Sequence, residues 1–314
     1  MHPPVAEQRP YTPVPLVEND PERRENRIPG WYRFFIGDIE ATMIADGRLP
    51  PCAPEEFTAV PRDTLDGALR RHFLPTNGLI LEQNCMVLRL GGKLVLFDTG
   101  IGYDKEMGGD ETGRLLLNMK AAHIDHIDIA AVVLTHAHSD HCWGLVDERG
   151  KRNFPNAELF VPESEYSFWT DEKRLSEDGY KGQFTAGARR NLLPYRDRLN
   201  VVADGREILP GVTALSTPGH SIGHTSYFIS SGGSNYVFIG DVAHSSVLHF
   251  EFPHMQFSYD LDALQAVESR RRLFDLAATE GMSLIGYHFP FPGVGNIRRE
   301  GPAYAYVSAP VLHK

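Results

Sequence analysis

Three histidines and one aspartate stand close together in the middle of the sequence, as His136, His138, Asp140 and His141. Neutral imidazole is a common zinc ligand, and a carboxylate adds the charge that a second divalent ion needs. Groups at i, i+2, i+4 and i+5 cannot all face one way on a helix or a strand, whereas a loop can wrap them around one or two ions. The sequence therefore predicts a metal-binding loop.

This loop follows an apolar run, 129–134, whose length and Val/Ile content are typical of a short buried strand. Other strand-like segments also end at a polar residue that could bind a metal or orient a ligand. These residues are Asp98, His220, Asp241 and His288. One polar residue at a strand end could arise by chance. Five such positions along one chain, including the 136–141 cluster, predict one shared sheet edge and one metal site. Asp98 has two interpretations, as a cap of the turn before Gly100 or as a carboxylate that orients a metal-bound histidine.

The remaining pattern predicts how these residues are positioned. Strands are expected at 31–36, 40–45, 79–90, 93–97, 157–161, 212–215, 236–239 and 283–285, and helices at 65–71, 111–122, 163–169 and 186–193. Gly91 and Gly92 predict a hairpin turn. The polar stretch 170–185, which bears aromatic residues, either lines a substrate pocket or packs on the surface. A Pro-rich N-terminal arm is expected at 1–29 and one domain at 30–314.

Composition limits the classes of partner. The chain has 314 residues and a formal net charge of -10, which disfavours nucleic acid and anionic membrane surfaces. No apolar run reaches the ~20 residues of a membrane span, and no secretory signal is visible at the N-terminus. Three cysteines, Cys52, Cys85 and Cys142, cannot build a disulfide framework. We therefore expect a cytoplasmic protein with a small-molecule substrate.

Together the motifs resemble the metallo-β-lactamase fold superfamily. The resemblance rests on H-x-H-x-D-H at 136–141, Pro-Gly-His at 218–220, Gly-Asp at 240–241, the late His288 and the Asp-Thr-Gly turn at 98–100. The segments 217–225, 288–295, 154–157 and 168–169 are similar to the methyl parathion hydrolase and lactonase group. The resemblance runs from about residue 30 to the C-terminus. It implies an α/β (α+β) fold, a four-layer αβ/βα sandwich with the metals at one edge between two sheets.

The resemblance also implies the ligands of two divalent ions. His136, His138 and His220 would bind the first ion, and Asp140, His141 and His288 the second, with Asp241 bridging them. Two ions roughly 3.5–4 Å apart can hold a bridging hydroxide and polarise the bond under attack. A ligand set of nitrogen and oxygen suits zinc and leaves manganese, cobalt and iron open. Next to the ligands, His224 is expected as a buried supporting histidine.

The position three residues after Asp241 bears on the substrate. Acyl-homoserine lactonases of this superfamily carry a tyrosine there, where this chain has His244. An alkoxide leaving group needs a proton donor more than an aryloxide does. The sequence therefore favours hydrolysis of small neutral aryl esters or phosphotriesters, with a lactonase as the nearest alternative. Asp140, Asp241 and His244 are the expected catalytic groups, although His244 could instead only pack near the site.

Other members of the superfamily fit less well. One class of β-lactamase carries a cysteine where this chain has Asp241, and flavodiiron-like members carry glutamate in place of His138. A mononuclear iron oxidoreductase and a non-catalytic metal-binding relative remain open. By likeness, Trp143, Trp169 and Phe184 are candidates for the substrate pocket, and the Trp143 ring either narrows its mouth or lies beneath the metal loop. Since the family often dimerises, a homodimer also stays open.

Overall fold

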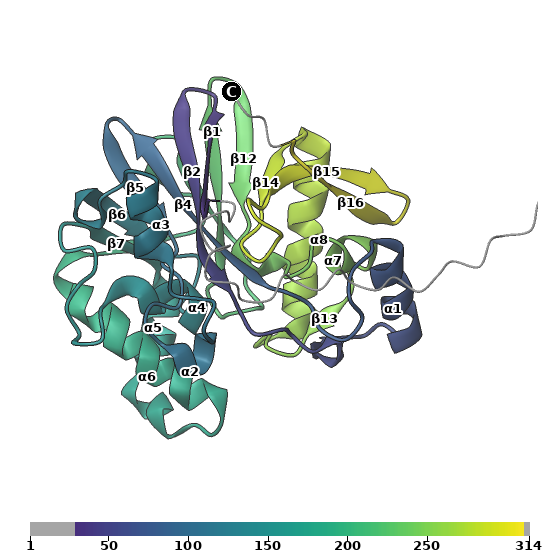
Figure 1. Cartoon of the computed structure of the whole chain (residues 1–314), viewed down its shortest axis with the longest axis horizontal. Helices are drawn as coiled ribbons and strands as arrows, with labels where there is room; N and C mark the ends of the chain where they lie inside the picture. Colours follow the sequence, from purple (N-terminus) through teal and green to yellow (C-terminus); the bar gives the residue numbers. More distant parts are fainter. Residues whose placement is uncertain (1–28, 311–314) are drawn as a thin grey trace, which may run out of the picture.

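Two large β-sheets face each other between outer layers of helices (Figure 1). The computed structural model describes residues 29–310. The expected arm at 1–29 thus lies outside the described residues except for its last position. The four layers confirm the αβ/βα sandwich implied by the resemblance.

The first sheet has the order β1-β2-β4-β5-β6-β7-β8. Its strands are β1 (Trp31–Ile36), β2 (Ile39–Arg48), β4 (Glu82–Leu90), β5 (Lys93–Phe97), β6 (Ile129–Val133), β7 (Glu158–Pro162) and β8 (Leu199–Val202). The pairs from β1 to β5 are antiparallel, and those from β5 to β8 are parallel. Because parallel neighbours end at the same edge, Asp98 after β5 and the histidine loop after β6 emerge together.

The second sheet has the order β16-β15-β14-β12-β11-β10-β9. Its strands are β9 (Glu207–Leu209), β10 (Val212–Ser216), β11 (Thr225–Ser231), β12 (Ser234–Phe238), β14 (Ser283–Ile285), β15 (Val294–Glu300) and β16 (Ala303–Ser308). The parallel pair β12 and β14 delivers Asp241 and His288 to one edge, and the β10–β11 connection carries His220. A small separate sheet pairs β3 (Phe57–Thr58) with β13 (Gln256–Phe257).

The helices flank both sheets (Figure 1). They are α1 (Arg62–Arg71), α2 (Lys105–Gly108), α3 (Leu115–Ala121), α4 (Ser139–Cys142), α5 (Glu163–Thr170), α6 (Tyr180–Leu192), α7 (Leu248–Glu251) and α8 (Ala263–Glu280). Figure 1 shows α3 to α6 on the side of the first sheet, and α1, α7 and α8 on the other half.

Several helices differ from the sequence predictions, and strands β8, β9, β11, β15 and β16 were not predicted. Helix α6 begins at Tyr180 rather than at 186, because Phe184, Ala188 and Leu192 already form a buried face at four-residue spacing. The stretch 170–185 is therefore part short 3-10 helix and part α6, not one polar insertion. Helix α3 starts at 115 rather than 111. Helix α8 was not predicted, although its buried positions repeat at helical spacing. In contrast, the hairpin at Gly91 and Gly92 is confirmed, with φ of 55° and 83°.

Aromatic rings join the two sheets in the core. Phe97 of β5 contacts Tyr227 of β11 and Phe238 of β12, with ring centroids 5.6 and 5.7 Å apart. The Tyr227 hydroxyl donates to the carbonyl of Leu134, 2.8 Å away, at the end of β6. Since both sheets are packed through these rings next to the strand ends, the relative position of the two edges is set by the core.

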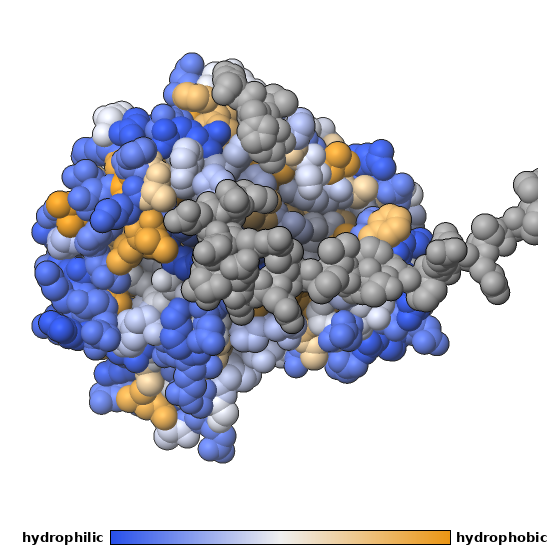
Figure 2. Space-filling view, viewed as in Figure 1, coloured by the Kyte–Doolittle hydropathy of each residue, from blue (hydrophilic) through white to orange (hydrophobic). Residues whose placement is uncertain are grey.

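The outer surface is polar. On the face shown in Figure 2, hydrophilic residues cover the outer helices and apolar residues are scattered between them. Within residues 29–310, every helix is too short or too polar to cross a lipid bilayer.

Asp46 anchors the segment that follows β5. Its buried carboxylate accepts hydrogen bonds from the backbone N–H groups of Ile101, Gly113 and Leu115, at 3.0, 3.2 and 2.9 Å. Gly100 has a φ of 67°, and an added Cβ there would lie 2.2 Å from the Asp46 carboxyl carbon. The carboxylate and the glycine together bring the 98–115 segment against the sheet.

We expect Asp46→Ala to lower the free energy of unfolding by about 3 kcal/mol, because three backbone donors lose their partner. Urea denaturation of the metal-saturated protein measures this change. Asp178→Ala, at an exposed position, is the control and should leave stability unchanged. A loss below about 1 kcal/mol in Asp46→Ala would contradict the anchoring role.

Candidate metal centre

The structure brings all seven predicted ligands to one edge of the sandwich. Potential ligand atoms lie within 4.8 Å of one another in overlapping groups: His136, His138 and His220; His136, His141 and Asp241; and Asp140, His141 and His288. The histidine motif is a loop followed by the single helical turn α4, which carries Asp140 and His141, and the ring centroids of His136 and His141 lie 4.0 Å apart. These groups can hold two metal ions.

Asp241 lies between the two outer groups. Its Oδ2 is 3.2 Å from Nε2 of both His220 and His288, and its Oδ1 is 3.1 Å from His141 Nε2. The side chain is 4% exposed. The position of this carboxylate supports the bridging role expected for Asp241.

The buried ring nitrogens fit metal ions better than hydrogen bonds. Nε2 of His136 and Nε2 of His141 are buried without a hydrogen-bond partner, as is Oδ1 of Asp241. His138 Nδ1 and His220 Nε2 face each other at 2.9 Å. Two neutral imidazoles can share only one proton across such a contact, whereas one cation would satisfy both lone pairs. Unpartnered buried nitrogens are costly, so the donor set suits divalent ions.

The ring nitrogens that point away from the proposed metal positions form hydrogen bonds. Asp98 Oδ2 lies 2.8 Å from His141 Nδ1, and the same carboxylate accepts two hydrogen bonds from Thr135. The Glu82 carbonyl lies 2.8 Å from His288 Nδ1. Such contacts set the tautomer that points the other nitrogen at a metal. This geometry favours the orienting interpretation of Asp98 over the turn cap.

The sequence analysis did not identify Asp260. This carboxylate contacts Nδ1 of His220 in the same way as Asp98 contacts Nδ1 of His141. Its Oδ1 lies 2.9 Å from His220 Nδ1, and its Oδ2 accepts a hydrogen bond from the backbone of Phe257. Asp260 is 40 residues from His220 and belongs to no motif, so only the fold reveals the pair.

Burial and neighbouring charges shift the pKa values of the buried groups in the metal-free site. Although burial opposes the shift, the surrounding histidines hold the pKa of Asp241 well below its ordinary value. Burial lowers the pKa of both His220 and His141, but the nearby carboxylates outweigh it. Asp241 raises the pKa of His220 to about 9. Together, Asp241, Asp140 and Asp98 raise the pKa of His141 well above its usual range. Protons on these imidazoles thus balance the buried carboxylates, and metal ions would displace them.

His224, predicted as a supporting residue, is fully buried between Thr217 and the backbone of Asp241. Its Nε2 accepts a hydrogen bond from the backbone of Asp241 at 2.9 Å, and its Nδ1 lies 2.9 Å from Thr217 Oγ1. Burial lowers its pKa to about 3. A neutral His224 therefore links the loop of His220 to the backbone of Asp241.

His244 lies directly beside the bridging carboxylate. Its Nε2 is 3.2 Å from Asp241 Oδ2, and its ring is stacked between Phe257 and His288, with centroids 4.0 and 5.4 Å away. Burial lowers the pKa of His244 to about 4, so the ring is neutral at pH 7. His249 fixes the backbone here, because its Nδ1 accepts the N–H of His244 at 3.1 Å.

Arg270 of α8 holds the same segment from behind. The buried guanidinium donates to the carbonyls of Val242 at 2.7 Å and Met255 at 2.5 Å. It thus ties both ends of the 242–255 segment, which carries His244, to one helix. Nothing in the sequence distinguishes Arg270 from the other arginines of α8.

The three predicted pocket aromatics occupy different places. Trp143 is 4% exposed and lies under the metal loop, where a Cβ on Gly187 would come within 2.0 Å of its ring. Trp169 is fully buried, and its indole N–H donates to Ser221 at 2.9 Å. Phe184 contacts the ring of His138 at 5.1 Å. The burial favours supporting roles for the two tryptophans, and pocket lining stays a prediction for Phe184.

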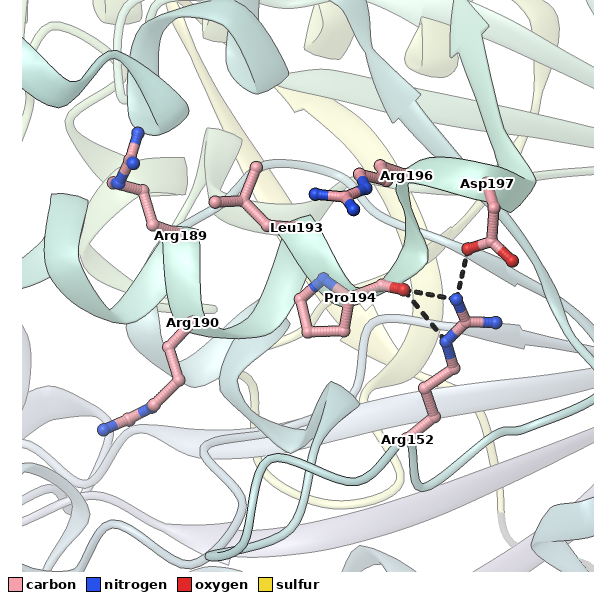
Figure 3. Close-up of a pocket in the computed structure, with 7 residues that line it drawn as sticks. All are labelled: Arg152, Arg189, Arg190, Leu193, Pro194, Arg196 and Asp197. Atoms are coloured by element: carbon pink, nitrogen blue, oxygen red, sulfur yellow. Dashed lines mark hydrogen bonds and ion pairs between the residues drawn. The ribbon is translucent and has the colours of Figure 1, made fainter.

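A pocket elsewhere is lined by arginines (Figure 3). Its lining residues are Arg152, Arg189, Arg190, Leu193, Pro194, Arg196 and Asp197. Arg152 is engaged by the Pro194 carbonyl and by Asp197, and the Arg189 and Arg190 side chains point in different directions. Since the guanidinium groups do not converge, this pocket is not a built anion site.

Comparison with known proteins identifies the family. A sequence profile of the metallo-beta-lactamase superfamily matches residues 80–279. The chain belongs to this superfamily.

Similar proteins include lactonases. The chain is 27% identical over 172 residues to an N-acyl homoserine lactonase of Bacillus thuringiensis and 26% identical over 182 residues to N-acyl homoserine lactonase AttM of Agrobacterium fabrum. These matches cover 54% and 55% of the chain, and 60% and 62% of the relatives. The chain thus spans less than two thirds of the length of these relatives.

Two solved structures share nearly the whole fold. Hydrolase AbOPH has a TM-score of 0.85 and 29% identity, covering 91% of this chain and 100% of that one. AidC, a dizinc quorum-quenching lactonase in complex with a product, has a TM-score of 0.84 and 26% identity, covering 90% and 99%.

The metal-free protein should lose stability in acid because His224 is neutral when folded. Its pKa is about 3 in the fold and about 6.5 in an unfolded chain, so the unfolded state takes up the proton first as pH falls. From pH 7.5 to pH 5 this costs about 2 kcal/mol. Urea unfolding at both pH values, compared with His224→Gln, isolates the effect, since the variant lacks this titration. An equal loss in both proteins would contradict it.

Proposed function

We propose that this chain is a dinuclear metal-dependent hydrolase that opens small neutral lactones, with N-acyl homoserine lactones as the leading class. The observation that carries the proposal is the buried donor set of seven ligand-type groups divided around Asp241. Two bound divalent ions would supply an activated water nucleophile at neutral pH and polarise the carbonyl. Because hydrolysis of this kind requires no separate side-chain base, the ligands themselves account for most of the site.

The named relatives support lactones over other esters. The sequence alone placed aryl esters and phosphotriesters first, but the lactonases of Bacillus thuringiensis and Agrobacterium fabrum and the structure of AidC reverse this order. A dizinc neighbour also supports hydrolysis over single-iron redox chemistry.

Aromatic rings near the first ligand group support an apolar substrate. Phe184, beside His138, contacts Tyr180 at 5.3 Å, and Tyr180 contacts Tyr259 at 5.7 Å. On the other side, Tyr259 contacts Phe257 at 5.5 Å, which stacks on His244. These rings form a continuous apolar wall from one side of the centre to the other, which suits an acyl chain better than a charged group.

The chain's own residues have distinct proposed roles. Asp241 holds the two halves of the centre together. Asp140, the most exposed of the seven ligands with 13% of its side chain accessible, faces the solvent side. His244 Nε2 lies 3.2 Å from Asp241 Oδ2 and Nδ1 has no hydrogen-bond partner among the described groups, so the neutral ring can act as a hydrogen-bonding group toward a substrate oxygen.

Turnover measurements test the proposed substrate. Protein reconstituted with zinc should contain about two ions per chain and hydrolyse N-hexanoyl-homoserine lactone with kcat/KM at least about tenfold above that for a p-nitrophenyl ester or an aryl phosphotriester. Chelation should reduce the rate to background, and added zinc should restore it. Asp241→Asn is the inactive control.

Full zinc occupancy without lactone turnover would overturn the substrate assignment, and one bound iron per chain would overturn the hydrolase itself. Phosphotriester hydrolysis is the second candidate. His244, at the position where lactonases of the superfamily carry tyrosine, favours it because an aryloxide leaves with little protonation.

His244→Gln should affect the hydrolysis of the lactone, which has an alkoxide leaving group, more than that of the p-nitrophenyl ester, which has an aryloxide leaving group. If the neutral His244 ring stabilises the departing oxygen by a hydrogen bond, kcat for the lactone should fall by about 10-fold, whereas kcat for the p-nitrophenyl ester should change little. The ratio of the two rates is the readout, with metal content checked in parallel. An equal loss for both substrates would contradict this stabilisation and indicate a packing role.

A further inference from the structure

Glu165 of α5, which belongs to no motif, joins the two loops that carry the first ligand group. Its side chain is fully buried. Oε2 accepts a hydrogen bond from the backbone N–H of Ala137 at 3.0 Å, and Oε1 accepts one from Gly223 at 2.6 Å. Ala137 separates His136 from His138, and Gly223 lies three positions after His220. One carboxylate therefore holds the backbone beside all three ligands.

Trp169, one helical turn after Glu165, strengthens the same junction. Its Nε1 donates to Ser221 Oγ at 2.9 Å, and the Ser221 hydroxyl in turn bonds the Glu165 carboxylate. Ser221 is adjacent to His220 in the chain. At Gly223 the loop approaches α5 so closely that a Cβ would lie 2.1 Å from Ser164 Oγ.

Joining two loops through a buried carboxylate carries a large desolvation free energy. Removing its charge from water costs several kcal/mol unless other groups compensate. Among the described residues, Glu165 has three neutral donors and forms no ion pair. A negative charge behind three histidine ligands becomes favourable when a cation lies in front of them. This placement points to a role in metal binding beyond loop packing.

The second ligand group has separate supports. His141 is oriented by Asp98 and His288 by the Glu82 carbonyl, and none of these contacts involves α5. Asp98 also reaches the first group indirectly, because Thr135 Oγ1, which donates to Asp98, lies 3.0 Å from His136 Nδ1, whereas the contacts of Glu165 are confined to the loops of the first group.

We propose that Glu165 is a positioning residue that sets the spacing of His136, His138 and His220 for the first metal ion without affecting the second. The proposal rests on the ligand assignment above and not on the identity of the substrate.

Cobalt titration of the metal-stripped protein tests this. Glu165→Gln keeps the size of the side chain but places an amide NH2 against a backbone donor. We expect the affinity of the first ion to fall by about 10- to 100-fold while that of the second stays within about twofold. Visible absorption of Co²⁺ follows occupancy, and competition with a chromophoric chelator gives the two zinc affinities.

Three matched variants make the result specific. Asp98→Asn should show a different pattern, with the second ion weakened more than the first, because Asp98 contacts His141 directly and His136 only through Thr135. Glu163→Gln, at an exposed position on the same helix, should bind both ions as the wild type does. Ser221→Ala should weaken the first ion in the same direction as Glu165→Gln, and it carries the test if Glu165→Gln does not fold.

Wild-type affinities for both ions in Glu165→Gln, or equal weakening of both, would overturn the proposal. Because the readout is metal affinity, a wild-type protein that binds two ions but lacks lactonase activity would remove the proposed function and leave this inference intact.

Discussion

The burial of one carboxylate among histidines is the constraint on which the rest of the structure depends. Asp241 is almost inaccessible to water, and five histidine nitrogens lie within 3.9 Å of its oxygens. A buried negative charge is tolerated when hydrogen-bond donors or positive charge are held against it, and around Asp241 the histidines provide both. The strand ends of both sheets must therefore meet at one edge, which requires the two sheets to pack in one relative position. The ring contacts between Phe97, Tyr227 and Phe238 provide that packing directly behind the site.

Further carboxylates behind the ligands extend this arrangement. Asp98, Asp260 and Glu165 come from different parts of the fold, and each contacts a ligand or the backbone beside one. Their negative charge favours a divalent ion in front of the histidines and fixes the direction of the ring nitrogens. Rigid supports of this kind allow the ligands to be in place before a metal arrives, so little ordering cost remains at binding.

The proposed substrate side of the centre draws on aromatic rings from two parts of the chain. Phe184 and Tyr180 come from α6, whereas Phe257 and Tyr259 precede α8, so two halves of the chain meet at this wall. His244 belongs to the second half, held by His249 and Arg270. This side is coupled to the metal ligands, because His244 lies three residues after Asp241 and the Phe184 ring contacts the ring of His138.

The sequence by itself identified the seven candidate ligands and most of the strands that end beside them. Each ligand stands at the end of an apolar segment, and such local patterns survive in the linear chain because a strand end and its turn are only a few residues long. Asp98 was identified for the same reason. Tertiary structure alone decided that Asp260, Glu165 and Arg270 support the site, since their partners lie 15 to 58 residues away and carry no matching motif. It also decided that the Trp143 ring lies beneath the metal loop against Gly187, because a close approach of helix and loop is a property of packing and not of either segment.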